Sequence, residues 1–87
     1  MYTLEINNAL DKKLEKIFKK NKKLFDIIIK KSKEIILNPN HYKNLRKPLN
    51  HLKRVHIDKN FVLTFSVNES SKTVTLEDFD HHDKIYK

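Results

Sequence analysis

The stretch LKRVHIDKNFVLTFSVNESSKTVTLEDF, residues 52–79, decides the fold. It contains three runs in which apolar and polar side chains alternate, at 52–58, 61–67 and 72–79. Such alternation is typical of strands with one buried face. The turn-forming segments at 58–60 and 68–71 are short, and short turns join strands into an antiparallel meander. Residues 52–79 therefore predict three consecutive antiparallel strands.

The N-terminal half predicts one more strand and a helical hairpin. Residues 2–6 alternate as an opening strand does, and the asparagines at 7 and 8 can cap a helix. The β-branched run 27–29 could form a short strand, but the periodic lysines around it favour helix. Pro39 ends the hairpin, because the residue before a proline avoids the helical region. On either side of Asn21, apolar residues recur at helical spacing: Leu10, Leu14, Ile17, Phe18, then Leu24, Phe25, Ile28, Ile35 and Ile36.

These elements give the order β-α-α-β-β-β in a single domain of residues 1–87. The fold class is α+β, with an N-terminal helical hairpin packed on one face of a mostly antiparallel four-stranded sheet. The other face of the sheet is expected to contact solvent. The apolar stripes of both helices, Phe18 and Phe25 included, are expected to lie in the core.

The composition restricts the classes of function. Nineteen Lys and Arg against eleven Asp and Glu give a net charge of +8, which favours nucleic acid or an acidic protein as partner. A lysine-rich solvated surface is the alternative. The absence of cysteine excludes disulfides and thiolate metal sites, and together with the lack of a long apolar run it predicts a cytoplasmic protein with no membrane partner. The absence of glycine excludes a phosphate-cradling glycine loop.

Two pairs of side chains are candidates for chemistry. Arg54 and His56 lie two residues apart on the polar face of a strand, where Arg54 can hold a phosphate and His56 can transfer a proton near neutral pH. If residues 81–86 form one helical turn, His82 and Tyr86 share a face and could combine proton transfer with stacking on a base. The alternatives are a merely solvated strand face and a frayed C-terminus.

A metal centre or a nucleophilic serine is not expected. The histidines lack metal-binding spacing, and the side chains of the adjacent His81 and His82 point apart in regular structure. The serines at 66, 70 and 71 lie in strand or turn, with no oxyanion glycine loop nearby. We therefore expect no cofactor and no metal.

The segments 49–65 and 76–86, with their motifs RVHI, VLTF and DHHDKIY, resemble the C-terminal half of RelE/ParE superfamily toxins, and above all archaeal RelE-like and YafQ-like mRNA interferases. The element order and the length agree, so the resemblance spans nearly the whole chain. It implies a type II toxin paired with a RelB-like or DinJ-like antitoxin, with a heterotetramer as one allowed assembly. It also implies mRNA cleavage in the ribosomal A site, without metal, by attack of the 2′-hydroxyl on the adjacent phosphate.

The resemblance assigns roles residue by residue. His56 corresponds to the strand histidine of YafQ-like members and Arg54 to a basic RelE residue on the same strand. His82 corresponds to the C-terminal histidine, the proposed general acid, and Tyr86 to the terminal aromatic. The side chains expected to bind RNA around these catalytic candidates are Arg46, Lys47, Lys53, His81 and Lys84.

The chain also departs from the family pattern. Asn60 stands at a YafQ-like aspartate and cannot act as a base, while Val62 and Asp80 stand where RelE has arginines. Lys47 lies near a further YafQ-like histidine, but only across a gap. These departures favour the histidine-based, YafQ-like chemistry. The alternatives are a ParE-like toxin that acts on DNA gyrase without cutting RNA, and a degenerate RNA-binding member.

Overall fold

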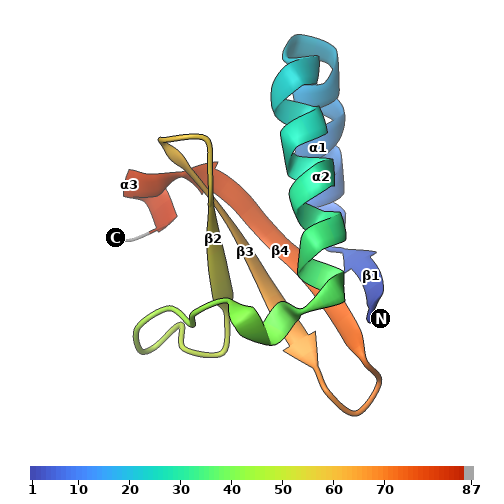
Figure 1. Ribbon diagram of the computed structural model, residues 1–87. Coiled ribbons are helices and arrows are strands. Elements are labelled where there is room, and N and C mark those ends of the chain that lie inside the picture. Colours follow the sequence, from blue (N-terminus) through green and yellow to red (C-terminus); the bar gives the residue numbers. More distant parts are fainter. Residues whose placement is uncertain (86–87) are drawn as a thin grey trace.

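The computed structural model describes residues 1–85 and confirms the α+β fold (Figure 1). Its strands follow the spatial order β1-β4-β3-β2, with β1 parallel to β4 and the other neighbours antiparallel. No helix within residues 1–85 is long and apolar enough to cross a membrane. The elements in chain order are β1 (Thr3–Ile6), α1 (Asn8–Lys20), α2 (Lys22–Leu37), the 3-10 turn η1 (Pro39–His41), β2 (Lys53–Ile57), β3 (Phe61–Asn68), β4 (Thr73–His81) and α3 (His82–Ile85).

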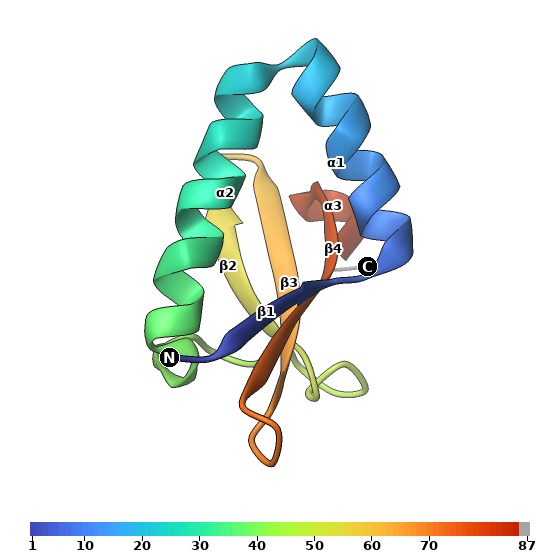
Figure 2. The same cartoon turned by 90° about the vertical axis from the view of Figure 1, so that its right-hand side faces the viewer.

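Asparagine side chains define the helical hairpin, as predicted. The Asn7 side chain accepts a hydrogen bond from the Ala9 N–H at 2.9 Å and caps α1. Asn21 ends α1 through its own N–H, which donates to the Ile17 carbonyl, and its side chain accepts the Leu24 N–H to begin α2. Figure 2 shows the two helices meeting at this link and diverging toward the sheet.

The main core lies between the hairpin and one face of the sheet. The prediction that Phe18 belongs to it was wrong, because its side chain is 47% exposed and packs edge-on against the Phe25 ring at 5.0 Å. Phe18 lies in the last turn of α1, toward the tip of the hairpin, and this tip rises beyond the sheet in Figure 1. The buried members of the core are Leu10, Leu14, Ile28, Ile35, Ile57, Leu63, Phe65, Val74, Leu76 and Phe79.

The sequence predicted that the face of the sheet away from the helices contacts solvent. In the structure, part of this face is covered. Val62 and Thr64 are buried although they lie in register with His56 and Arg54, on the side opposite the helices. Leu45 is 5% exposed and, like Val62, lies outside the main core cluster. The loop between η1 and β2 and the short helix α3 lie on this side (Figure 1). The sheet is therefore partly covered on both faces.

A β-bulge reverses the orientation of side chains in the second half of β4. Thr64 pairs with Asp78 but the next residue, Phe65, pairs with Leu76, so Glu77 is an extra residue in β4. Leu76 and Phe79 both reach the main core despite being three residues apart. The bulge therefore turns Asp78 and Asp80 toward the face that carries Arg54 and His56, since Thr64 and Val62 lie in register with both sets.

Lys13 of α1 reaches across the edge of the sheet to these carboxylates. Its Nζ lies 3.0 Å from Asp78 Oδ1 and 3.3 Å from Asp80 Oδ2. Burial alone would lower the pKa of Lys13, but the two carboxylates outweigh it and raise that pKa above the ordinary value. Burial likewise would raise the pKa of Asp80, but the His81 N–H and the Lys13 ammonium hold it below the ordinary value.

We predict that Leu45→Ala lowers the free energy of unfolding by about 2–3 kcal/mol, because it leaves a void on the second face. The matched change Leu37→Ala should cost less than about 0.5 kcal/mol, because Leu37 is 65% exposed. Urea denaturation monitored by circular dichroism measures both values. Equal effects of the two substitutions would show that the second face is not packed.

We predict that Asp80→Asn lowers the free energy of unfolding by about 0.5–1 kcal/mol at pH 7, a value kept small by solvent screening. A depressed carboxyl pKa stabilises the fold above the unfolded-state value near 3.8, and this stabilisation is lost as pH falls through the folded-state pKa. The difference between wild type and variant should therefore shrink in acid denaturation series below about pH 4. A difference that stays constant down to pH 2 would contradict the ion pair.

Candidate active site

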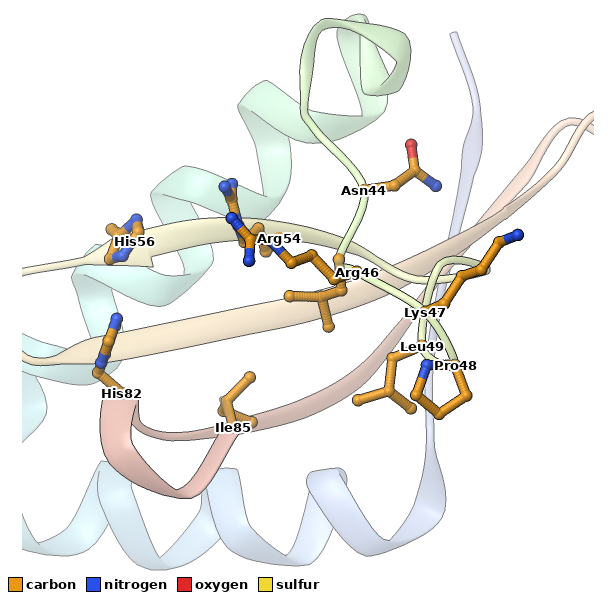
Figure 3. Close-up of a pocket in the computed structure, with 10 residues that line it drawn as sticks. Asn44, Arg46, Lys47, Pro48, Leu49, Arg54, His56, His82 and Ile85 are labelled. Atoms are coloured by element: carbon orange, nitrogen blue, oxygen red, sulfur yellow. The ribbon is translucent and has the colours of Figure 1, made fainter. Parts of the chain in front are cut away.

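A cavity of about 620 Å³ opens on the face of the sheet that carries Arg54 and His56. This volume lies in the range of pockets that enclose small ligands. Side chains from β2, from the loop before it and from α3 converge on the cavity (Figure 3). The residues that line it are Asn44, Leu45, Arg46, Lys47, Pro48, Leu49, Arg54, His56, His82 and Ile85.

Strand β2 supplies the two predicted side chains because strand residues alternate between faces. Val55 and Ile57 point to the main core, so Arg54 and His56 face the cavity. The Arg54 N–H donates to the Lys43 carbonyl at 3.0 Å, which ties this part of β2 to the loop before it. Arg54 thus lies in the first part of β2, which is hydrogen-bonded on both edges.

The short helix α3 brings His82 to His56. The His82 N–H donates to the Asn60 carbonyl at 2.7 Å, which fixes the start of α3 beside the β2–β3 turn. The ring centroids of His56 and His82 lie 5.7 Å apart with the planes inclined by 23°, so the imidazoles stack loosely at one end of the cavity. Figure 3 shows both rings facing each other. Tyr86, the remaining predicted catalytic residue, lies outside the described residues.

The loop over residues 44–49 forms the opposite wall. The Leu45 N–H donates to the Leu52 carbonyl at 2.9 Å, and the Asn44 side chain donates to the Asn50 carbonyl at 2.8 Å. These bonds close the loop on itself and hold its shape. Two of the predicted RNA-binding residues, Arg46 and Lys47, lie on this wall (Figure 3).

The other three predicted RNA-binding residues do not line the cavity. Lys53 donates to the Tyr42 carbonyl and to Asn44 Oδ1, each at 3.1 Å, so its ammonium supports the loop. The His81 ring contacts the Phe61 ring edge-on at 5.8 Å, and the Lys84 ammonium lies 3.9 Å from Asp80. The contacts of Lys53 could not be predicted from the strand pattern alone, because they depend on how the loop returns to β2.

The cavity also has an apolar side that the sequence reasoning missed. Pro48 and Leu49 come from the loop and Ile85 from α3. Loop residues have no periodic pattern that would mark them as cavity-lining, so no signal in the sequence points to them. The cavity thus combines positive charge, two imidazoles and apolar surface, a set that suits a phosphate next to a planar organic group. Within residues 1–85 no cluster of three or more histidine or carboxylate side chains is arranged to hold a metal ion.

Several solved structures share this fold at low sequence identity. A chain of the Mycobacterium tuberculosis RelBE2 toxin–antitoxin complex has a TM-score of 0.79 at 17% identity, with 93% of this chain and 98% of that chain covered. Escherichia coli YafQ gives 0.74 at 15% identity over 100% of both chains. A YoeB/ParE toxin from Agrobacterium tumefaciens gives 0.82 at 11% identity, covering 92% and 98%. At such identities the likeness concerns the fold alone.

Two relatives are much closer in sequence, although no protein-family model matches the chain. An uncharacterized protein of Methanosarcina mazei is 64% identical over 86 residues, covering 99% of this chain and 100% of its own length. A Methanocaldococcus jannaschii protein named "Putative toxin RelE4" is 61% identical over 87 residues, covering 100% of this chain and 93% of its own length. Because this second relative matches over the whole chain, the protein belongs to the RelE/ParE superfamily of toxins.

Proposed function

We propose that this toxin is a metal-free endoribonuclease that cuts mRNA on the ribosome, with His56 and His82 as its proton-transfer pair. The observation that carries the proposal is the contact of the two imidazoles, 5.7 Å between centroids, at the end of a basic cavity. Histidine is the side chain best suited to give and take protons near neutral pH. A pair of imidazoles can therefore supply the base and the acid of one phosphoryl transfer.

In the proposed reaction His56 takes the proton of the ribose 2′-hydroxyl as that oxygen attacks the adjacent phosphorus. The bond from phosphorus to the 5′-oxygen breaks, and His82 gives a proton to the leaving oxygen. The products are a 2′,3′-cyclic phosphate and a 5′-hydroxyl. No electron transfer is needed, and protons balance because one is taken and one is given.

Arg54 is proposed to stabilise the charge that develops on the phosphorane. A guanidinium binds phosphate oxygens through two parallel hydrogen bonds and stays charged at every working pH. Arg54 lies on the same strand face as His56 and, like His82, lines the cavity. Arg46 and Lys47 add positive charge on the facing wall, where they are proposed to hold the RNA backbone.

A RelB-like or DinJ-like antitoxin is the proposed partner that silences the toxin. One structural neighbour is a RelBE2 toxin–antitoxin complex, and another is a heterotetrameric YoeB–YefM complex of Staphylococcus aureus. The net charge of +8 favours an acidic segment in such a partner. The pair is proposed to assemble as a heterotetramer, and size-exclusion chromatography of the co-expressed toxin and antitoxin would test this.

We predict that His56→Ala and His82→Ala each relieve growth arrest when the toxin is expressed without its antitoxin. Each should reduce mRNA cleavage, followed by primer extension, by about 10²–10⁴-fold, the usual contribution of general acid–base catalysis. His41→Ala is the matched control, because His41 is exposed on η1 and does not line the cavity. It should remain toxic.

Circular dichroism and antitoxin binding must be unchanged for the two histidine variants to be informative. Full toxicity of the His56→Ala/His82→Ala double variant would rule out the assigned roles. If mRNA remains intact while DNA cleaved by gyrase accumulates, the toxin acts as a ParE-like inhibitor instead. Binding of RNA without cleavage would identify a degenerate RNA-binding member.

We predict that cleavage requires the 2′-hydroxyl at the cut site. A ribosome-bound mRNA with a single 2′-deoxynucleotide at the mapped position should resist cleavage there, since the nucleophile is missing. The matched control carries the deoxynucleotide three positions away, roughly one codon, and should be cut as usual. Mass spectrometry of normal products should find a 2′,3′-cyclic phosphate. Cleavage of the deoxy substrate at the usual rate would exclude this mechanism.

A further inference from the structure

One part of the sheet edge lies next to the candidate site and accepts hydrogen bonds from a lysine side chain of α1. Strand β1 pairs only with residues 73–76 of β4, so the outer edge of residues 77–81 has no neighbouring strand in the described chain. Lys13 of α1 covers this edge. Its Nζ donates to the Phe79 carbonyl at 2.9 Å, to Asp78 Oδ1 at 3.0 Å and to Asp80 Oδ2 at 3.3 Å. An ammonium has three N–H donors, so each can have an acceptor.

The same contacts lead to His82. The second oxygen of Asp80, Oδ1, accepts the His81 N–H at 2.7 Å and lies 3.9 Å from the Lys84 ammonium. His82 follows directly and is held on its other side by the Asn60 carbonyl. The end of β4 and the beginning of α3 are therefore fixed from both α1 and the β2–β3 turn.

Lys13 pairs with carboxylates far away in the sequence, whereas three other lysines form ion pairs with residues close by. Lys22, Lys31 and Lys72 pair with carboxylates three or four residues away, within one helix or one turn. Such local surface pairs contribute little to stability. Lys13 instead joins α1 to side chains 65 and 67 positions further along the chain. It therefore fixes α1 relative to the end of β4.

We propose that Lys13 is a positioning residue that sets the place of the His82 imidazole relative to His56. The inference rests on the proposed function, because it assumes that the two imidazoles act together. A catalytic pair works only when its geometry is held closely, and small displacements lower the rate of the chemical step rather than substrate binding. Removal of Lys13 takes away its three hydrogen bonds to residues 78–80, immediately before His82.

The test compares Lys13→Met with Lys31→Met. Both remove one positive charge, so their general effect on attraction to RNA is the same, but Lys13→Met breaks two ion pairs that join distant elements and Lys31→Met breaks one local pair. Lys13→Met should lower kcat for mRNA cleavage by about tenfold with KM changed less than about twofold, while Lys31→Met should leave both near wild type. Lys13→Arg should restore most of kcat, because a guanidinium can also bridge the two carboxylates.

Nuclear magnetic resonance provides a readout that needs no activity. In wild type, nuclear Overhauser contacts should connect the His56 and His82 rings; in Lys13→Met they should weaken, and in Lys31→Met they should persist. If Lys13→Met does not fold, Asp80→Asn is measured in its place and should show the same changes.

The outcomes separate the two proposals. A folded Lys13→Met variant with unchanged ring contacts and unchanged kcat would overturn the positioning role, leaving Lys13 only a contributor to stability. Wild-type protein that cleaves no mRNA would instead refute the proposed function, and the ring contacts would still decide whether Lys13 positions His82.

Discussion

The antiparallel register between β2 and β3 determines the function of each side of this sheet. Val55 opposite Leu63 faces the helices, and the next pair, His56 opposite Val62, faces the cavity. Because the side-chain period of a strand is two, a slip of one residue would exchange the two sides completely. The buried side of the pairing is thus what keeps the polar side in place. Core packing and the candidate site depend on one set of backbone hydrogen bonds.

Charge is distributed across the sheet in a way that follows from that register. On the cavity face, β2 carries Arg54 and His56, β3 carries the uncharged Thr64 and Val62, and β4 carries Asp78 and Asp80. The two carboxylates are engaged by Lys13 at the far edge of the sheet. The basic side chains of this face therefore gather on β2 and the acidic ones on β4, and the chain as a whole carries a net charge of +8.

Local patterns predicted most of the fold but only half of the candidate site. The alternation in residues 52–58 was sufficient to place Arg54 and His56 on one face, because that inference needs only the period of a strand. The approach of His82 to His56 depends on the Asn60 carbonyl and on how α3 folds back, which are contacts between distant segments. The prediction that Phe18 lies in the core failed for a similar reason. Its helical spacing is correct, but the sheet ends before the hairpin does.

The bulge at Glu77 has a consequence for how this sequence can vary. The residues of β4 that follow it are out of phase with the first half of the strand. If the same residues alternated strictly, Phe79 would turn outward and Asp80 would point toward the apolar core, so the extra residue keeps Phe79 inside. Substitutions along β4 act one side chain at a time, whereas a further residue inserted after the bulge would invert the side chains of the end of the strand. We therefore expect the end of β4 to tolerate replacements far better than insertions.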